Sequence, residues 1–390
     1  MSRIYNDPAG GQASGVGPQT RTDYYQKQAL IESRKDQYFT QLADVTAMPK
    51  NMGKTIKRFH YIPLLDDENV NDQGIDASGA TITDGNLYGS SKDIGTISGK
   101  LPVLSETGGR VNRVGFKRKE LEGSIEKFGF FDEYTQESLD FDSDAELHQH
   151  INREMISGAV QITEAQLQTD LITSAGVIKY AGEATQDSEV DAASIVEYGD
   201  LMRLAIDLDN NRTPKHTKVI TGTRLVDTKT IPGSRVMYVG SEMIPVLRGL
   251  KDLHGDPAFI SVQHYGAAGT TLVGEVGSVD QFRVVVVPEM QRWSGGGAEL
   301  AVDDSDHYDN GTNYDVFPML VIGDGSFTTI GWQTDGKTVK FKITNKKPGP
   351  ETADRQDPYG ETGFMSIKWY YGFMGLRPER LAVLKTAAKL

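Results

Sequence analysis

Cysteine is absent from all 390 residues of the chain. Disulfide bonds, thiolate nucleophiles and thiolate metal sites are therefore excluded, and stability has to come from packing and association. Long apolar runs are missing too: the longest purely aliphatic stretch, residues 284–287, is far too short to cross a bilayer. The first residues also lack the basic-then-apolar pattern of a signal peptide. These absences predict a soluble chain and suit a reducing cytoplasm.

Basic residues are outnumbered by acidic ones. Lys and Arg together number 41 against 54 Asp and Glu, which gives a net charge of -13. An acidic chain of this kind is a poor general binder of nucleic acid or of anionic membranes, so any contact with a genome is expected to be local or weak. The length allows two or three hydrophobic cores, and one extended unit with several lobes is equally allowed.

The N-terminal segment has too few apolar residues to fold alone. Residues 1–20, "MSRIYNDPAGGQASGVGPQT", are rich in Gly, Ser, Gln and Pro. We expect an arm that only neighbouring subunits hold in order. Residues 21–46 have the apolar spacing of a helix, and residues 54–64 are predicted to form a strand.

A long polar stretch follows, from residue 66 to residue 93, with turn residues throughout. Loops of this length are usually functional or held by a partner. Two strand-like runs come next, "GTISGKLPVL" and "RVNRVGFKRKELEGSIEKFG", separated by the hairpin signal "SETGG". We expect the basic residues of the second run to contact acidic groups of an adjacent subunit, and a nucleic-acid patch is the alternative. These inter-subunit contact candidates are Arg110, Arg113, Lys117, Arg118 and Lys119.

A long helix is the strongest secondary-structure prediction. Ser143 and Glu146 match a capping box, in which the two side chains satisfy the first free amides of a helix. Apolar or small residues then recur at helical spacing as far as Gly176, a typical stop. The predicted helix runs from residue 144 to residue 174, about 46 Å at 1.5 Å per residue. Its predicted buried stripe comprises Leu147, Ile151, Met155, Gly158, Ile162, Ala165 and Ile172.

The second half of the chain predicts a compact α/β lobe and a late aromatic strand. In "GFMSIKWYYGFMG", residues 363–375, the alternation places Ile367, Trp369, Tyr371 and Phe373 on one face, with the other face available to neighbours. The final stretch, "LRPERLAVLKTAAKL", predicts a turn followed by either a strand or a short helix. Within the lobe, helices are predicted at 194–211 and 241–252, and strands at 216–222, 283–289 and 317–323.

One motif favours an enzyme. Residues 331–338 match G-x-x-x-x-G-K-[ST], the phosphate-binding loop, through Gly336, Lys337 and Thr338. Phosphate binding there requires a helix N-terminus after the loop, whereas "VKFKITNKK" alternates as a strand does. Asp335 and Gly336 are therefore predicted to form a hairpin turn. A nucleotide-binding enzyme is kept as the rival hypothesis.

No other spacing predicts catalytic chemistry or a metal site. The carboxylates at 140–144 lack the glycine and the final ligand of a calcium loop, because Ala145 and Ile151 occupy those positions. His150 and Glu154 are four residues apart, but spacing offers no third ligand. A nucleophilic triad cannot be assigned without a G-x-S-x-G motif. The sequence predicts no catalytic, cofactor-binding or metal residue, while a nonstandard cation site is left open.

The order of these parts resembles the tailed-phage capsid fold named for Hong Kong 97. Several extended segments make the resemblance more specific. Among them are "RTDYYQKQALIESRKDQYF", "PLLDDENVNDQGIDASGA", "GSVDQFRVVVVPEM" and "FTTIGWQTDGKTVKFK". They resemble the major capsid protein family of N4-like podophages, over nearly the whole chain.

The resemblance implies an α+β, HK97-like major capsid fold with five segments. They are an N-terminal arm at 1–50, a strand and extended loop at 51–128, a peripheral domain with the long spine helix at 129–189, an axial α/β lobe at 190–345, and a return to the peripheral sheet at 346–390.

The function implied is that of a non-enzymatic shell protein with no catalytic residues and no cofactor. Copies would form hexamers and pentamers of an icosahedral shell around double-stranded DNA, with weak or no specific DNA binding and no membrane. Portal, scaffolding and decoration proteins are the other expected partners. The protein would assemble in the host bacterial cytoplasm and end in the virion. A phage decoration or fibre protein is a further alternative, although the repeats typical of fibres are absent.

Overall fold

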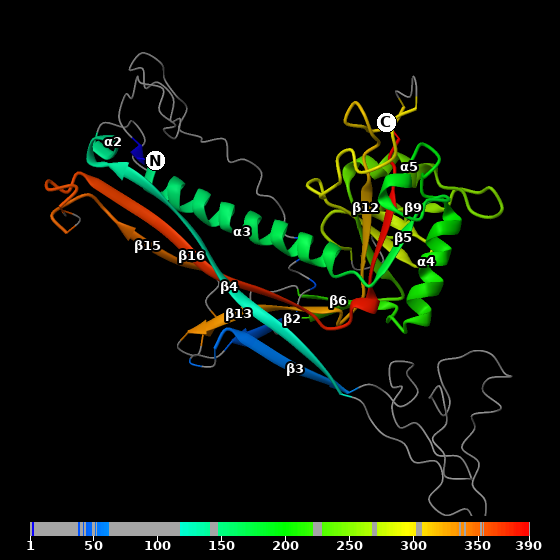
Figure 1. Cartoon of the computed structure of the whole chain (residues 1–390), viewed down its shortest axis with the longest axis horizontal. Helices are drawn as coiled ribbons and strands as arrows, with labels where there is room; N and C mark the ends of the chain where they lie inside the picture. Colours follow the sequence, from blue (N-terminus) through cyan, green and yellow to red (C-terminus); the bar gives the residue numbers. More distant parts are fainter. Residues whose placement is uncertain are drawn as a thin grey trace, which may run out of the picture. The chain divides into compact units, whose positions relative to one another are not determined.

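The chain divides into two compact units, Thr55–Ser124 (unit 2) and Met1–Lys54 with Ile125–Leu390 (unit 1). In the computed structural model shown in Figure 1, the described residues are 2–3, 38–39, 42, 44–48, 51, 53–61, 118–140, 147–220, 228–266, 271–301, 306–334, 337–338, 341–351, 353 and 355–389.

A mixed sheet of eight strands carries the first hydrophobic core. Its strand order is β1-β4-β16-β13-β14, while β15 pairs with β16, β2 with β13 and β3 with β4. The strands are β1 (Ser2–Arg3), β2 (Asp44–Met48), β3 (Thr55–Tyr61), β4 (Arg118–Thr135), β13 (Phe327–Thr334), β14 (Lys337–Thr338), β15 (Phe341–Lys346) and β16 (Thr362–Gly375).

A second sheet of seven strands carries the other core of unit 1. Its order is β5-β17-β12-β8-β11-β10-β9, and a separate ribbon joins β6 (His216–Ile220) to β7 (Thr228–Pro232). The seven strands are β5 (Val177–Tyr180), β8 (Arg235–Val239), β9 (Phe259–Ser261), β10 (Glu275–Val279), β11 (Phe282–Val286), β12 (Phe317–Ile322) and β17 (Leu381–Thr386). Every residue of β8, β12 and β17 is buried, as expected for strands covered on both faces.

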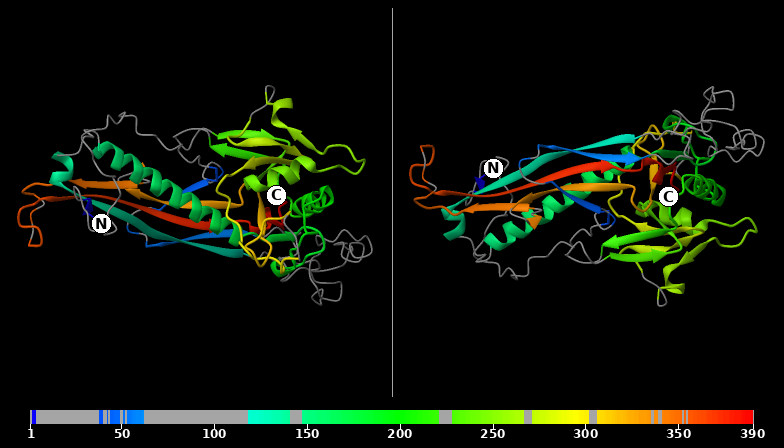
Figure 2. Two further views of the ribbon diagram at one scale, coloured as in Figure 1. Left: turned by 90° about the horizontal axis from the view of Figure 1, so that it is seen from above. Right: turned by 90° about the horizontal axis from the view of Figure 1, so that it is seen from below.

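The longest helix, α3 (Leu147–Thr173), has 27 residues and covers one face of the eight-stranded sheet (Figures 1 and 2). The predicted long helix is thereby confirmed, and its expected start at residues 144–146 lies outside the described residues. Gly176 lies three residues beyond the end of the helix, at a position that requires glycine because a Cβ there would lie 2.6 Å from the carbonyl oxygen of Pro378. The other helices among the described residues are α2 (Gln136–Asp140), α4 (Tyr198–Asn210), α5 (Ile244–Gly249) and the 3-10 turns η2 (Asp187–Glu189), η3 (Ser241–Met243), η4 (Val262–His264) and η5 (Pro378–Arg380).

The predicted buried stripe of α3 is only partly right. Ile162 is 48% exposed and Ala165 is also exposed. The buried row advances in steps of four residues, and such a row drifts around a helix of 3.6 residues per turn. In the second half of the helix the buried residues therefore differ from those predicted from the sequence. The buried row comprises Ile151, Met155, Ala159, Thr163, Leu167, Leu171 and, beyond the helix, Ala175.

The aromatic stretch forms β16, and its alternation is confirmed through Tyr371. Met365, Ile367, Trp369 and Tyr371 are all buried, and they belong to the core that includes residues of α3. Met374 lies on the other face of the strand, which was expected to be available to neighbours, yet its side chain is buried. The expectation is therefore wrong at the end of the strand. There β16 pairs with β13, and Met374 lies opposite Thr328, which is itself fully buried.

The two sheets do not follow the boundaries predicted for the axial lobe, 190–345, and for the return segment, 346–390. Residues 346–390 were expected to rejoin the first sheet, but β17 pairs with β12 and β5 in the second. The reason is its composition, since a strand that is apolar on both faces fits the middle of a covered sheet. Conversely, β13 and β15 lie in the first sheet, although the axial range was drawn to residue 345.

The prediction of a helix at 21–46 is wrong for residues 44–46, which the structure describes. Asp44–Met48 forms β2, a strand parallel to β13 with Val45 opposite Thr329. Backbone pairing with an available strand edge overrides local helix propensity here. Residues 21–37 lie outside the described residues.

Candidate assembly interface

Unit 2 contains a two-stranded antiparallel ribbon. All seven residues of β3 pair with the first seven of β4, from Thr55 opposite Ser124 to Tyr61 opposite Arg118. Phe59 and Tyr61 are 49% and 66% exposed. Exposed aromatic side chains of this kind are suited to an interface with another chain.

Two of the five predicted contact residues lie on this ribbon. Arg118 and Lys119 are both exposed on β4, and Arg110, Arg113 and Lys117 lie outside the described residues. Consecutive strand residues point to opposite faces, so Arg118 and Lys119 do not form one patch. The guanidinium carbon of Arg118 lies 4.1 Å from the centre of the Phe59 ring, a cation–π contact that holds the aromatic side chain under a positive charge.

Sequence reasoning missed the acidic partners within the ribbon. Lys57 Nζ lies 2.7 Å from Glu120 Oε1 and 2.5 Å from Glu122 Oε1. The hydrogen bonds to these glutamates raise the pKa of Lys57, and the hydrogen bond from Lys57 lowers the pKa of Glu120. The alternation in "KELE" was the available signal, because residues two apart share one face of a strand. These pairs are solvent-exposed and hence screened by salt.

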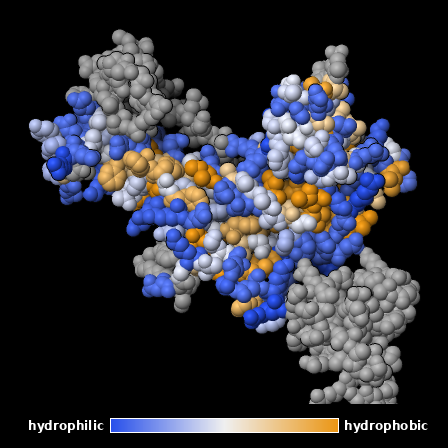
Figure 3. All heavy atoms as spheres, in the orientation of Figure 1, coloured by the Kyte–Doolittle hydropathy of each residue, from blue (hydrophilic) through white to orange (hydrophobic). Residues whose placement is uncertain are grey.

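Other large apolar side chains are exposed on unit 1. On the face seen in Figure 3, hydrophobic residues form separate patches within a largely hydrophilic surface. Scattered exposure of this kind is normal, so only the more exposed side chains indicate contact surface. Among the described residues of unit 1 they are Tyr359 at 85%, Leu253 at 74%, Phe131 at 61%, Ile206 at 55%, Val273 at 53% and Ile260 at 52%.

The motif at 331–338 is part of a hairpin. Lys337 and Thr338 form β14, which pairs antiparallel with β13 through Thr334 and Gln333. Asp335 and Gly336 lie outside the described residues. Because the next described element is the strand β15, Lys337 does not precede a helix N-terminus of the kind that binds phosphate. The strand expected after the motif is confirmed.

We expect no saturable binding of ATP and magnesium in calorimetry of the full chain. Lys337 sits on a strand, where backbone amides pair with the neighbouring strand and do not converge on a ligand. Lys337→Ala should give the same flat titration as the unmodified protein. Micromolar binding that Lys337→Ala abolishes would contradict this assignment.

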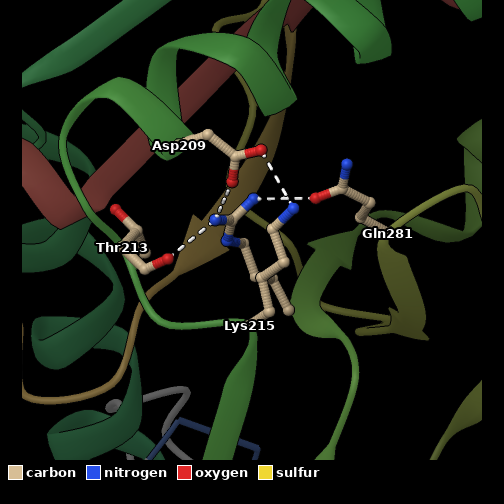
Figure 4. Close-up of polar contacts among 5 residues, drawn as sticks. Asp209, Thr213, Lys215 and Gln281 are labelled. Atoms are coloured by element: carbon tan, nitrogen blue, oxygen red, sulfur yellow. Dashed lines mark hydrogen bonds and ion pairs between the residues drawn. The ribbon is translucent and has the colours of Figure 1, made fainter.

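A buried charged cluster lies in the second lobe of unit 1 (Figure 4). Arg235, at the start of β8, is fully buried, and its Nη2 donates to Asp209 Oδ1 at 2.5 Å and to the carbonyl of Thr213 at 2.7 Å. Its Nη1 donates to Gln281 Oε1 at 3.2 Å, and Lys215 Nζ lies 3.0 Å from Asp209 Oδ2. The cluster ties the end of α4 to β8 and to the turn before β11, which is a structural role.

The described part of the chain contains few other groups of residues that could form a binding or metal site. It contains no group of three or more His, Asp or Glu residues able to hold a metal ion, and no helix in it is long and apolar enough to cross a membrane. A hollow of about 620 Å³ lies between the start of α4 and the end of α5. Glu197 in its wall caps α4 through a reciprocal pair with Asp200, so this carboxylate is already engaged.

Comparison with known proteins gives a consistent picture. The model of a family described as phage capsid protein matches residues 118–386. A major capsid protein of Pseudomonas phage KPP21 is 64% identical over 386 residues, which cover 99% of this chain and 97% of the relative. The chain therefore aligns with that protein along almost its entire length.

Two solved capsid structures share the fold at low sequence identity. The capsid of Ralstonia phage GP4 matches with a TM-score of 0.62 and 11% identity, covering 97% of this chain and 99% of that one. The capsid of Cyanophage P-SCSP1u matches with a TM-score of 0.53 and 13% identity, covering 94% and 93%. The predicted α+β, HK97-like capsid fold is thereby confirmed.

Proposed function

The chain belongs to the phage capsid protein family, and from this premise we propose that its copies assemble as hexamers and pentamers into a closed icosahedral shell around double-stranded phage DNA. Its function is that of a major capsid protein of the virion, which is a structural protein and not an enzyme. The observation that carries the proposal is the 64% identity to a major capsid protein along 99% of the chain. Self-association is further supported by the assembled capsids that share the fold.

We also propose the finer features that the resemblance implies. Residues 1–50 would be the arm, 51–128 the extended loop and 129–189 the peripheral domain with α3. The seven-stranded sheet would form the core of the axial lobe. Assembly would take place in the host cytoplasm, with portal, scaffolding and decoration proteins as further partners, and the phage would be an N4-like podophage.

The five predicted basic residues are proposed as contacts to acidic groups of an adjacent subunit. Arg118 supports this, because it lies exposed on a ribbon that also exposes Phe59 and Tyr61. Glu120 and Glu122 already balance Lys57 within the same ribbon. These two carboxylates are thus engaged with a lysine outside the five, so the acidic groups for the five basic residues are expected to come from the adjacent subunit.

Electron microscopy of the purified full chain should show closed particles or capsomers. Arg113→Glu with Arg118→Glu should leave the circular dichroism spectrum unchanged while the yield of particles falls. A single exposed ion pair contributes only about 0–1 kcal/mol, but each interface recurs around every capsomer and the effect multiplies. The control, Arg248→Glu with Lys251→Glu, makes the same charge change at exposed positions of unit 1.

Two results would count against these proposals. Monomers under every condition that assembles other shell proteins would contradict the shell function itself. Normal assembly of the reversed protein, together with retention of DNA by the unmodified protein at physiological salt, would replace the acidic-neighbour contact by the nucleic-acid alternative.

A further inference from the structure

Several basic side chains gather at one end of the seven-stranded sheet. Ile322, the last residue of β12, lies opposite Leu381 at the start of β17 and opposite Val236 at the start of β8. The end of α4, the strand β6 and the turn η5 lie at this same end of the sheet. They carry a basic cluster, which we define as Arg212, Lys215, Lys218 and Arg380.

Two of these segments meet at Asp324, in the connection that follows β12. Its carbonyl accepts a hydrogen bond from Arg380 Nη1 at 3.0 Å, and its Oδ2 lies 3.6 Å from Lys218 Nζ. The same Oδ2 lies 3.4 Å from His216 Nε2. The residue before it, Gly323, donates its amide to the carbonyl of Arg380 at 3.0 Å. These contacts hold η5 against β6.

The end of α4 joins the same surface. Lys215 Nζ lies 3.0 Å from Oδ2 of Asp209, near the end of the helix (Figure 4). The side chain of Asn211 donates to the carbonyl of Glu379 at 2.9 Å, so the end of α4 also contacts η5. The basic cluster is therefore continuous across α4, β6 and η5.

Carboxylates are scarce around the basic cluster. Residues 209–218, 323–326 and 376–380 contain five Lys and Arg against three Asp and Glu. One of the three, Asp209, also accepts a hydrogen bond from the fully buried Arg235. This surface therefore keeps an excess of positive charge, on a chain whose net charge is -13.

Arg212 has a backbone conformation that favours glycine. In the Schellman motif that ends α4, the amide of Arg212 donates to the carbonyl of Asp209 at 3.0 Å and the amide of Thr213 to that of Leu208 at 2.9 Å. The motif places Arg212 in the left-handed region, with a φ of 53°. Its side chain is exposed and makes no hydrogen bond or ion pair with the described residues. An arginine at such a position, without a partner in the chain, indicates that its guanidinium serves an external ligand.

The basic cluster suits the phosphate groups of a nucleic-acid backbone. Arginine binds phosphate through a planar fork of donors, and sequence-independent contact with DNA requires only exposed cations. An interface with another protein has a more apolar centre. None of the large apolar side chains exposed among the described residues lies within 209–218, 323–326 or 376–380. These segments therefore fit a polyanion better than a second protein surface.

We propose that the basic cluster binds the phosphate backbone of the double-stranded DNA that the shell encloses. This inference rests on the proposed shell function and adds to it the place where the protein contacts the genome. The contact is local, because the acidic surface elsewhere repels a polyanion. It reads no base sequence, because phosphate contacts carry no sequence information.

Lysine acetylation of assembled particles tests the contact in the shell. DNA-filled particles and DNA-free particles are treated with a small acetylating reagent, and the modified lysines are quantified by mass spectrometry. Lys215 and Lys218 should react several-fold less in filled particles than in DNA-free ones, because bound phosphate covers their amines. Lys251, exposed elsewhere on the same lobe, should react equally in both.

Every other pattern of acetylation overturns the inference. Equal protection of Lys215 and Lys218 in both kinds of particle would assign the basic cluster to an adjacent copy. Equal reactivity in both would show a surface in contact with solvent alone. Failure of the chain to form any particle would instead contradict the proposed shell function, and DNA binding by the unassembled chain would still test the inference.

Binding of the unassembled full-length chain to a short fluorescent duplex, measured by anisotropy at several salt concentrations, isolates the cluster from assembly. Each phosphate contact contributes about 0.9 to the slope of log K against log salt, so Arg212→Gly with Lys218→Gln should lower the slope by about 1.8. The matched control, Arg248→Gln with Lys251→Gln, removes one arginine and one lysine at exposed positions and should leave the slope unchanged. No binding by the unmodified chain, or an equal loss in the control, would overturn the proposal.

Arg212→Gly alone separates DNA binding from folding. Glycine adopts the left-handed conformation without strain, so this variant should resist urea at least as well as the unmodified protein. Its salt slope should nevertheless fall by about 0.9. A purely structural role of Arg212 at the end of α4 would give the reverse, a loss of stability with unchanged DNA binding, and that result would overturn the proposal.

Discussion

Trp369→Ala should lower the free energy of unfolding by about 3–5 kcal/mol. The indole is 3% exposed, and its ring centre lies 6.0 Å from those of both Phe128 and Phe130. It packs beside these two phenylalanines of β4, the strand next to β16, within the core that includes α3. Its removal costs the transfer free energy of the indole and leaves a cavity that two rigid elements cannot close.

Urea denaturation of the full chain, followed by circular dichroism, measures this loss. The described residues of unit 1 form two large hydrophobic cores, so two transitions can occur, and Trp369→Ala should shift the one that melts α3. Tyr359→Ala is the matched control, because that aromatic side chain is 85% exposed and should change the stability by less than about 0.5 kcal/mol. Equal shifts for the two variants would show that Trp369 is not a central packing residue.

The aromatic strand shows what the sequence predicts well. Its alternation indicates which side chains share a face, because a strand has a side-chain period of two, and Ile367, Trp369 and Tyr371 are buried as expected. The sheet that a strand joins depends on residues far away in the chain. The range 346–390 was therefore assigned to the first sheet as a whole, although β17 near its end pairs with β12 in the second.

The long helix shows a similar division between local and distant information. Its apolar spacing predicted the helix itself, whereas the buried row depends on which elements the helix contacts along its length. Ile162 has the right spacing and chemistry for the core, yet it is 48% exposed. The apolar spacing thus predicted the helix itself better than it predicted which of its residues are buried.

The candidate interface was the least predictable part. Like-charged residues close in sequence were visible at Arg118 and Lys119, but consecutive residues on a strand face opposite ways. Contacts between distant residues are harder still: Lys342 of β15 lies directly opposite Lys368 of β16, 26 residues later in the sequence, because of the register of the two strands. Register follows from the complete pattern of pairing, and no local motif contains it.

Arg235→Ala should cost about 3 kcal/mol of unfolding free energy in the second lobe. The guanidinium is fully buried and donates to Asp209, to the Thr213 carbonyl and to Gln281, so truncation removes three hydrogen bonds and leaves the carbonyl of the buried Thr213 without this donor. Breaking a buried ion pair typically costs about 3–5 kcal/mol. The lower end applies because the Asp209 side chain is 38% exposed and keeps Lys215 as a partner.

Arg235→Lys and Lys215→Ala separate the contributions in the same urea assay. Arg235→Lys keeps the charge but loses the planar fork that serves three acceptors at once, so an intermediate loss is expected. Lys215 is 52% exposed, and Lys215→Ala should cost less than about 1 kcal/mol. A full loss of stability in Lys215→Ala would show that the exposed pair, and not the buried fork, holds the cluster together.

The pH dependence of the Arg235→Ala effect tests the charge on Asp209. Burial acts to raise the pKa of Asp209, but hydrogen bonds from Arg235 and Lys215 outweigh it and hold the pKa below its ordinary value. A carboxylate with a lowered pKa contributes stability that is present above its unfolded pKa and is lost as pH falls through the folded one. The difference between Arg235→Ala and the unmodified protein should therefore be constant from pH 7 to about pH 5 and should shrink below about pH 4. If it stayed constant throughout, the cavity and the lost neutral hydrogen bonds would explain the whole effect, and the ion pair would contribute nothing.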